Sequence, residues 1–241
     1  MKGVLTIAIP TMKRWDFLQD TLPVFLARDE VAEVIVCDET GEDAAAIKVS
    51  EYNGNPKLRV VVNDRKLGIY ENKRKVFGLA DKAIPWVALL DSDNYFNDEW
   101  FDRLFETIDL TNEKMIYASA DFRHVDIHSG LVRYMCKDFS GVRLSKDSWN
   151  SVFDKKGWNF LLNDGNWVLP RGAYDMLPAS VRSEHYMAAD AIYMLRRFIL
   201  GGYTIWYVPD LVYIHTQHVN SSWMLTERES ARILSINDWR I

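Results

Sequence analysis

Two carboxylates, Asp91 and Asp93, directly follow residues 86–90, "WVALL", which are typical of a strand buried on both faces. In an extended turn, residues two positions apart can point to the same side, so both carboxylates can reach one ion or its waters. Mg²⁺ and Mn²⁺ prefer such oxygen ligands and commonly bridge one or two carboxylates to substrate phosphates. An isolated Asp-x-Asp pair is more often a solvated loop, but the buried strand in front of it favours a metal site here.

The first half of the chain alternates strand-like and helix-like segments. Apolar, β-rich runs occupy residues 4–10, 31–39, 57–64 and 86–91. Helix-like segments between them occupy residues 15–28, 41–52 and 69–83. Strands separated by helices of this length predict parallel βαβ units with right-handed crossovers, and hence an open α/β sheet.

Polar side chains end each of these predicted strands. They are Thr11, Asp38, Asn63 with Asp64, and Asp91 with Asp93. In open α/β sheets the ligand lies outside the carboxyl ends of the strands. The sequence therefore predicts one site along a single edge of the sheet.

The second half of the chain is less regular. Residues 115–126 and 130–139 predict a hairpin around the turn "HSG", and residues 185–202 predict a helix with a Gly-Gly stop. Residues 203–215 predict a strand, a turn and a second strand. A parallel half followed by a mixed half suits a nucleotide-binding half joined to an acceptor-binding half.

Length and composition indicate one domain. We expect it to span residues 1–241, with a nucleotide-binding half over about 1–95, an acceptor-binding and catalytic half over 96–215, and a tail or lid over 216–241. The formal charge of −5 gives no footprint for a phosphate polymer, so nucleic acid is not an expected partner. No signal peptide is recognisable and no apolar run approaches the length of a membrane span, so we expect a cytoplasmic protein without stable membrane insertion.

Several segments in order resemble glycosyltransferases of the GT-A fold, close to family 2, whose members are inverting and use nucleotide sugars. The segments are "TIAIPT", "EVIVCDET", "NDRKLGIYENKRKVFGLA", "VALLDSDNYF", "GNWVLPRGAYDML" and "MAADAIYMLRRFILGGYTIWYVPDLVYIH", over roughly residues 4–216. The resemblance implies a Rossmann-like α/β fold, with a mostly parallel nucleotide-binding half fused to a smaller mixed acceptor-binding half. It also implies transfer of a sugar to a glycan or other hydroxyl acceptor. The default donor is a UDP-sugar, with GDP and dTDP as alternatives.

The resemblance assigns roles to individual residues. Thr11 and Asp38 would contact the nucleoside, and Asp91 would lie near the ribose or a metal-bound water. Asp93 would ligate Mn²⁺ or Mg²⁺ at the diphosphate. Asp190 would be the catalytic base. His215 would be a third metal ligand beside Asp91 and Asp93.

Other assignments stay open at this point. Asp64 is counted with the donor-binding residues from its place at the predicted edge. In the basic segment at residues 72–75 the family usually has Ala-Arg-Asn, and we take Arg74 as the residue that meets the donor. Trp167 is the candidate for stacking on a sugar, although it also fits a core position. Ala189 stands where the family commonly has Glu before the base.

Purely structural roles are the alternatives for three of these residues. Asp38 can cap the turn that follows it, and Asp190 can be an ordinary first-turn acid that complements a helix dipole. His215 can be a structural histidine.

Two other functions are compatible with acidic residues at this edge. A nucleotidyltransferase of related α/β fold also needs acidic metal ligands, but it usually has a Gly-rich loop after the first strand, and "IPTMKRWDF" has no glycine. A non-catalytic nucleotide- or carbohydrate-binding module would be favoured by loss of the acidic pair, which is present.

Overall fold

Strands and helices alternate through the first hundred residues, as the sequence predicts. The structure is a computed structural model that describes residues 3–126, 130–135, 137–162, 165–180, 189–218, 228–229, 231–235 and 238–241. The first four strands are β1 (Leu5–Thr11), β2 (Val31–Asp38), β3 (Leu58–Val62) and β4 (Trp86–Leu89). The first four helices are α1 (Trp15–Ala27), α2 (Glu42–Val49), α3 (Ile69–Leu79) and α4 (Asp98–Thr107).

The second half contains longer strands and shorter helices. Its strands are β5 (Met115–Asp126), β6 (Val132–Met135), β7 (Arg143–Leu144), β8 (Trp167–Pro170) and β9 (Thr204–Gln217). Its helices are α5 (Trp149–Val152), α6 (Trp158–Leu162) and α7 (Asp190–Leu200), with 3₁₀ turns at Lys137–Phe139 and Arg171–Met176. The predicted hairpin is formed by β5 and β6, which pair antiparallel.

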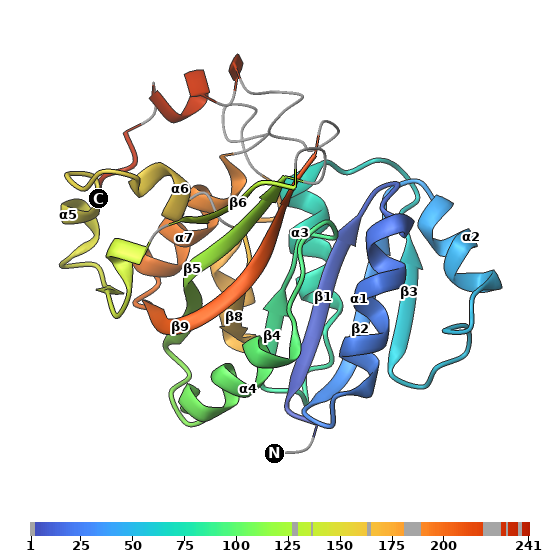
Figure 1. Ribbon diagram of the computed structural model, residues 1–241. Coiled ribbons are helices and arrows are strands. Elements are labelled where there is room, and N and C mark those ends of the chain that lie inside the picture. The colour runs from blue at the N-terminus through green and yellow to red at the C-terminus, as the bar shows by residue number, and fades with distance from the viewer. Residues whose placement is uncertain are drawn as a thin grey trace.

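One sheet contains the described strands of both halves (Figure 1). Its strand order is β3-β2-β1-β4-β8-β5-β9-β7, with β6 beside β5. The first four strands are parallel, because a helix crosses over between each strand and the next. β8 is antiparallel to both β4 and β5, and β5 pairs in parallel with β9. The predicted α/β sheet, mostly parallel in its first half and mixed in its second, is confirmed.

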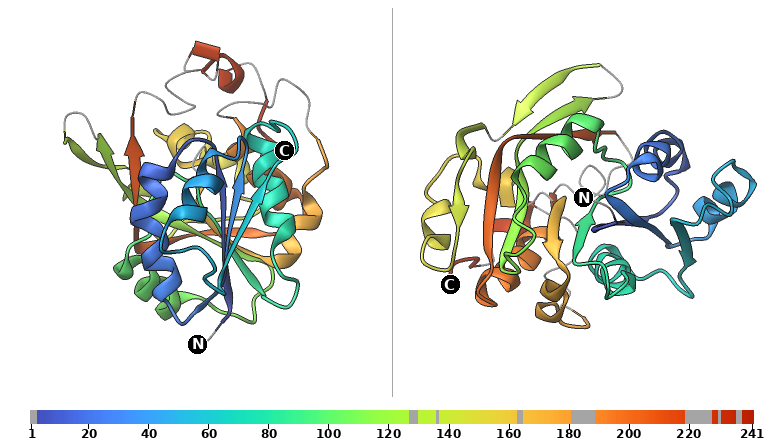
Figure 2. Two further views of the ribbon diagram at one scale, coloured as in Figure 1. Left: turned by 90° about the vertical axis from the view of Figure 1, so that its right-hand side faces the viewer. Right: turned by 90° about the horizontal axis from the view of Figure 1, so that it is seen from below.

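Helices cover both faces of this sheet (Figure 2). α1 and α4 pack on one face, and α3 and α7 pack on the other. β1 is mostly apolar because both of its faces are buried: Leu5, Ile7 and Ile9 pack on the side of α1 and α4, whereas Ala8 packs on the side of α3 and α7. Successive side chains of a strand point to opposite faces, so a strand between two helical layers has no polar face.

β9 differs from the prediction of a strand, a turn and a second strand. It is one strand that pairs with β5 on both sides of Pro209. The register shifts between Ser119 and Asp121, and Asp210 has a φ of 60°. The Pro-Asp pair therefore forms a bulge inside the strand, because the chain resumes its direction after it. As a result β9 runs parallel to β4 and ends at the same edge of the sheet.

The predicted tail or lid over 216–241 falls partly outside the described residues, which omit 219–227, 230 and 236–237. The described end of the chain packs on α5. Trp149 Nε1 donates to the backbone oxygen of Trp239 at 2.8 Å, and the Asn150 side chain bonds to the backbone of Ile241 in both directions. Among the helices of the described ranges, none combines the length and apolarity needed to cross a lipid bilayer.

Candidate active site

The turn after β4 carries the two predicted carboxylates. Asn94 N–H donates to the backbone oxygen of Asp91 at 2.9 Å, which closes the turn. The side-chain oxygen of Asn166 accepts hydrogen bonds from Asp91 N–H at 2.9 Å and from Asn94 Nδ2 at 3.3 Å. Asn166 lies just before β8, so the neighbouring antiparallel strand holds this turn in place. Within it, Asp91 and Asp93 have different partners.

Asp93 lies in a cationic environment. Its Oδ2 is 2.9 Å from His218 Nε2 and 3.6 Å from Arg14 Nε. Burial by itself raises the pKa of Asp93, but the hydrogen bond from His218 and the charges of His215, Arg14 and His218 outweigh it, so the pKa lies below its usual range. The carboxylate is therefore ionised at neutral pH.

His218, which was not among the predicted ligands, contacts Asp93 through its Nε2, and metal ligation by His215 stays a prediction. His215 is still inside β9, and its Nδ1 lies 3.4 Å from the hydroxyl of Tyr213. His218 is the first residue beyond the end of β9 at Gln217. The sequence analysis did not single out His218, because the Pro-Asp pair concealed the length of β9.

The contact between Asp93 and His218 fits two neighbouring ligands of one divalent cation. Two ligand atoms at right angles around Mg²⁺ or Mn²⁺ are about 3 Å apart, and these two atoms are 2.9 Å apart. The three predicted ligands Asp91, Asp93 and His215 are not gathered at one point. Within the part of the chain that the structure describes, no three carboxylate, imidazole or thiolate groups converge as they would around an ion.

Lys73 joins Asp91 to Asp190. Its ammonium lies 2.9 Å from Asp91 Oδ1 and 3.0 Å from Asp190 Oδ2. The Lys73 side chain is only 4% exposed, so both ion pairs are shielded from water. Burial opposes the charged ammonium, but the two carboxylates raise the pKa of Lys73 above its usual range. Lys73 is therefore a fixed positive charge between Asp91, which follows β4, and Asp190, which begins α7.

Asp190 opens α7 as predicted, and it is buried. Burial raises the pKa of its carboxyl above the usual range, whereas Lys73 lowers it and Asp91 raises it. The N-terminal position on α7 also places the carboxylate at the end of the helix dipole that stabilises negative charge. A buried carboxylate whose pKa is raised is a stronger base than an exposed one.

The position of Lys73 is set by a polar network between α3 and the sheet. Asn72 Nδ2 donates to the backbone oxygen of Cys37 on β2 at 3.2 Å, and Asn63 Nδ2 donates to Asn72 Oδ1 at 3.0 Å. Lys75 Nζ donates to Asn63 Oδ1 at 2.7 Å. These bonds fix the rotation of α3, and with it the side of the helix on which Lys73 lies.

The sequence contains a signal for Lys73 that the prediction of Arg74 overlooked. Lys73 lies three residues after Tyr70 and four before Phe77, on the stripe of α3 that faces the core. Arg74 lies one position further round the helix. Its Nε donates to the backbone oxygen of Leu177 at 3.1 Å, and its guanidinium stacks on Tyr174. Arg74 therefore has internal partners in this structure, and its contact with the donor stays a prediction.

Trp167 is a core residue rather than a platform for a sugar. It is fully buried on β8, and its ring packs edge-on against Phe198 with 6.3 Å between centroids. Its Nε1 has no hydrogen-bond partner among the described residues. Because β8 is buried on both faces between β4 and β5, neither side of the indole is open to a ligand.

The predicted nucleoside contacts at β1 and β2 are occupied by internal bonds. Thr11 Oγ1 donates to Asp43 Oδ2 at 2.6 Å. Asp38 is fully buried, and its two carboxylate oxygens accept from the backbone N–H groups of Thr40 and Ala44, each at 2.9 Å. Asp38 thus caps the turn into α2, which was its alternative interpretation.

Glu39 and Asp64 lie near these residues at the same edge of the sheet. Glu39 was not predicted, and its carboxylate accepts from the N–H groups of Leu67 and Gly68 at the start of α3. Asp64 is exposed in the loop after β3. Contact of Thr11 or Asp64 with a nucleoside stays a prediction.

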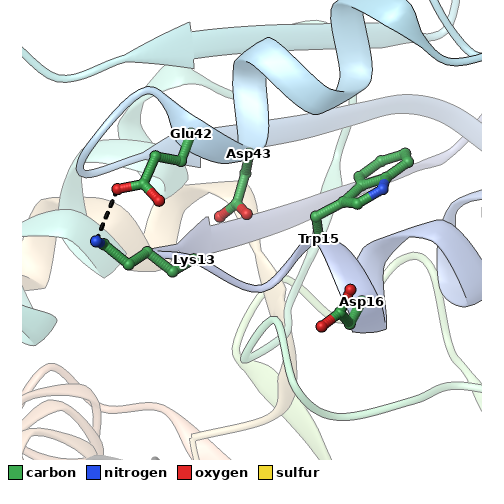
Figure 3. Close-up of a pocket in the computed structure, with 5 residues that line it drawn as sticks. All are labelled: Lys13, Trp15, Asp16, Glu42 and Asp43. Atoms are coloured by element: carbon green, nitrogen blue, oxygen red, sulfur yellow. Dashed lines mark ion pairs between the residues drawn. The ribbon is translucent and has the colours of Figure 1, made fainter.

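A pocket of about 270 Å³ opens beside the end of β1. Figure 3 shows the pair Lys13 and Glu42 on one side and Trp15 on the other, with Asp43 between them. Lys13 Nζ and Glu42 Oε1 are 2.8 Å apart. Asp43 also accepts from the backbone N–H of Arg14, whose side chain reaches Asp93. The pocket therefore adjoins the β1 end of the edge. Its lining residues are Lys13, Trp15, Asp16, Glu42 and Asp43.

Comparison with known proteins adds to these observations. Residues 6–164 match the model of glycosyl transferase family 2. The crystal structure of S. aureus TarS 1–349 is similar in fold, with a TM-score of 0.63 and 16% identity over 99% of this chain and 66% of that one. The same segment in complex with UDP-GlcNAc has a TM-score of 0.65 and 14% identity, over 97% of this chain and 64% of that one.

At this level of identity, the likeness to TarS shows the fold alone. The chain spans less than two thirds of the length of these two TarS structures. No curated protein matches the chain in sequence.

Proposed function

Because the chain belongs to glycosyl transferase family 2, we propose that it moves a sugar from a nucleoside diphosphate sugar to an acceptor hydroxyl, with inversion at the anomeric carbon. The observation that carries this proposal is the pair of ion pairs that Lys73 makes with Asp91 and Asp190. It places Asp190, a buried carboxylate whose pKa is raised, beside the carboxylate that follows β4. A single displacement needs such a pair of neighbouring regions, one for the donor and one for the base.

Asp190 is the general base of this mechanism. The acceptor O–H gives its proton to a carboxylate oxygen of Asp190 while the acceptor oxygen attacks the anomeric carbon from the face opposite the diphosphate. The bond between the anomeric carbon and the diphosphate oxygen breaks, and the electron pair leaves with the nucleoside diphosphate. Lys73 keeps Asp190 oriented and ionised before the proton moves.

The donor region is the edge formed by β1, β2 and β4. The acceptor region is the part of the edge beside α7. TarS, which is similar in fold, has been crystallised with UDP-GlcNAc. This observation supports a UDP-sugar as the donor for this chain, with GDP- and dTDP-sugars as the alternatives to test.

Asp93 and His218 are the residues that would hold a divalent cation, Mn²⁺ or Mg²⁺, at the donor diphosphate. Their 2.9 Å contact fits adjacent ligands, and the lowered pKa of Asp93 keeps the carboxylate ionised. Such a cation supplies charge neutralisation for the departing diphosphate. Arg14, 3.6 Å from Asp93, adds a second positive charge on the same side.

The function is tested by release of nucleoside diphosphate from UDP-GlcNAc, UDP-glucose, UDP-galactose, GDP-mannose and dTDP-glucose in the presence of Mn²⁺. We expect release from one nucleotide class, with water serving as a slow acceptor. The anomeric configuration of the product is read from NMR coupling constants. Absence of release from every donor would contradict the proposed transfer, and a retained configuration would contradict inversion.

A further inference from the structure

Gly165 lies where Lys73 meets Asp91. It immediately precedes Asn166, the residue that holds the turn after β4. A Cβ atom at Gly165 would clash with Lys73 Nζ and would lie 3.1 Å from Asp91 Oδ2, closer than ordinary van der Waals contact. The backbone of Gly165 is not in the left-handed region that the other glycines of turns adopt here. The need for glycine at this position therefore comes from the space beside the ammonium, not from the backbone.

The space matters because Lys73 is enclosed. Its ammonium is held between two carboxylates at 2.9 and 3.0 Å, with a side chain that is 4% exposed. A methyl group at residue 165 would displace the end of this flexible side chain more easily than it would displace backbone. The displaced ammonium would lose its place between Asp91 and Asp190, while the fold around it would remain.

We propose that Gly165 is a positioning residue for the transfer reaction, because its missing side chain is the space in which the Lys73 ammonium joins Asp91 to Asp190. The proposal rests on the function proposed above, in which Asp190 is the base. Gly165 has no group that contacts a substrate, so it acts through Lys73. Its effect should fall on turnover more than on binding of the donor, because the contacts proposed for the diphosphate involve Asp93, His218 and Arg14 rather than Lys73.

The first test is Gly165→Ala, assayed with the sugar nucleotide from the panel that gives the largest release. We expect kcat to fall by up to about tenfold at pH 7, because a change that acts only through Lys73 should not cost more than Lys73→Met itself. KM for the donor should change little. The matched control is Gly172→Ala, where a Cβ would meet only Tyr203 Oη at 3.6 Å, an ordinary contact. The control should keep wild-type kcat and KM.

The second test separates positioning from packing. Lys73→Met keeps the apolar stem but ends short of the ammonium, so the clash with a Cβ at residue 165 disappears. If Gly165 acts through Lys73, Gly165→Ala should cause no further loss of kcat in the Lys73→Met background. Independent multiplication of the two losses would overturn the proposal.

Folding is checked by thermal unfolding of each variant. If Gly165→Ala alone is not recovered folded, the double variant Lys73→Met/Gly165→Ala should be recovered with the stability of Lys73→Met, because the clash is relieved. Failure of the double variant where Lys73→Met folds would also overturn the proposal.

Asp190→Asn distinguishes failure of the proposed function from failure of the proposed role of Gly165. If Asp190→Asn retains turnover, the assignment of the base fails, whatever Gly165→Ala does. If Asp190→Asn is inactive and Gly165→Ala has wild-type kcat, only the role of Gly165 fails.

Discussion

Asp93 and Asp190 are both carboxylates at one edge of the sheet, and their surroundings shift their pKa values in opposite directions. Asp93 is paired with His218 and lies near His215 and Arg14, and its pKa is lowered despite burial. Lys73 is the cation that pairs with Asp190 among the described residues, and it also pairs with Asp91, while burial raises the pKa of Asp190. Hydrogen bonding and nearby charges decide the pKa of Asp93, and desolvation decides that of Asp190.

The opposite pKa shifts suit the two aspartates to different chemical roles. A carboxylate that stays ionised at all physiological pH values can hold a cation, but it is a weak base. A carboxylate with a raised pKa accepts a proton more readily near neutral pH. The comparison supports the proposed function, in which the region of Asp93 binds the donor and the region of Asp190 takes up the proton. Four predictions test it, in order of decreasing expected effect.

Asp190→Asn should give the largest loss, because the amide keeps the shape of the side chain but cannot accept the proton. We expect kcat to fall about 10²- to 10⁴-fold, while binding of UDP measured by calorimetry stays close to wild type. Asp175→Asn, on an exposed aspartate, is the control. Turnover near wild type would remove Asp190 from the role of base.

Asp93→Ala should weaken both donor binding and transfer, by about 10²-fold in kcat/KM, because the diphosphate loses its bridging cation. His218→Ala should act in the same direction, and His215→Ala should have the smaller effect of the two histidines. Asp20→Ala, on the exposed side of α1, is the control. Full activity of the wild-type protein in excess EDTA would contradict the metal-binding role.

Lys73→Met should move the pH dependence of turnover. Lys73 lowers the pKa of Asp190 against the effect of burial, so its removal should raise that pKa further. Asp190 works in its ionised form, and turnover is lost as pH falls through its pKa. The acid limb of kcat should therefore shift to higher pH, with a loss of about tenfold at pH 7. An acid limb that stays in place would show that Lys73 does not act on the base.

Arg74→Ala should have the smallest effect and should separate Arg74 from its neighbour Lys73. It removes the stacking on Tyr174 and the hydrogen bond to Leu177, so the free energy of unfolding should fall by about 1 kcal/mol. Turnover and KM should stay at wild-type values. A loss of donor affinity comparable to that of Asp93→Ala would support the sequence-based assignment of Arg74 to the donor.

The sequence by itself determined the first four strands of the sheet and the polar side chains at their carboxyl ends. Apolar runs and helical spacing are local patterns, and they predicted β1 to β4, the crossovers between them and the polar residues at the carboxyl ends. The same patterns predicted a helix over residues 185–202, of which α7 (Asp190–Leu200) is the part that the structure describes as helix, and the family resemblance placed Asp190 at a helix start. These features could be predicted because hydrophobic periodicity reports which side of an element is buried.

The tertiary structure alone decided which polar side chains meet. Lys73 and Asp190 come from helices in different halves of the chain, and Asn166 reaches the turn of Asp91 from β8. Asp38 and Trp167 lie in the expected elements, but internal bonds and burial take both away from the edge. His218 reaches Asp93 because β9 continues through Pro209 and Asp210. Contacts between distant segments depend on strand order, register and helix rotation together, and no local pattern in the sequence contains them.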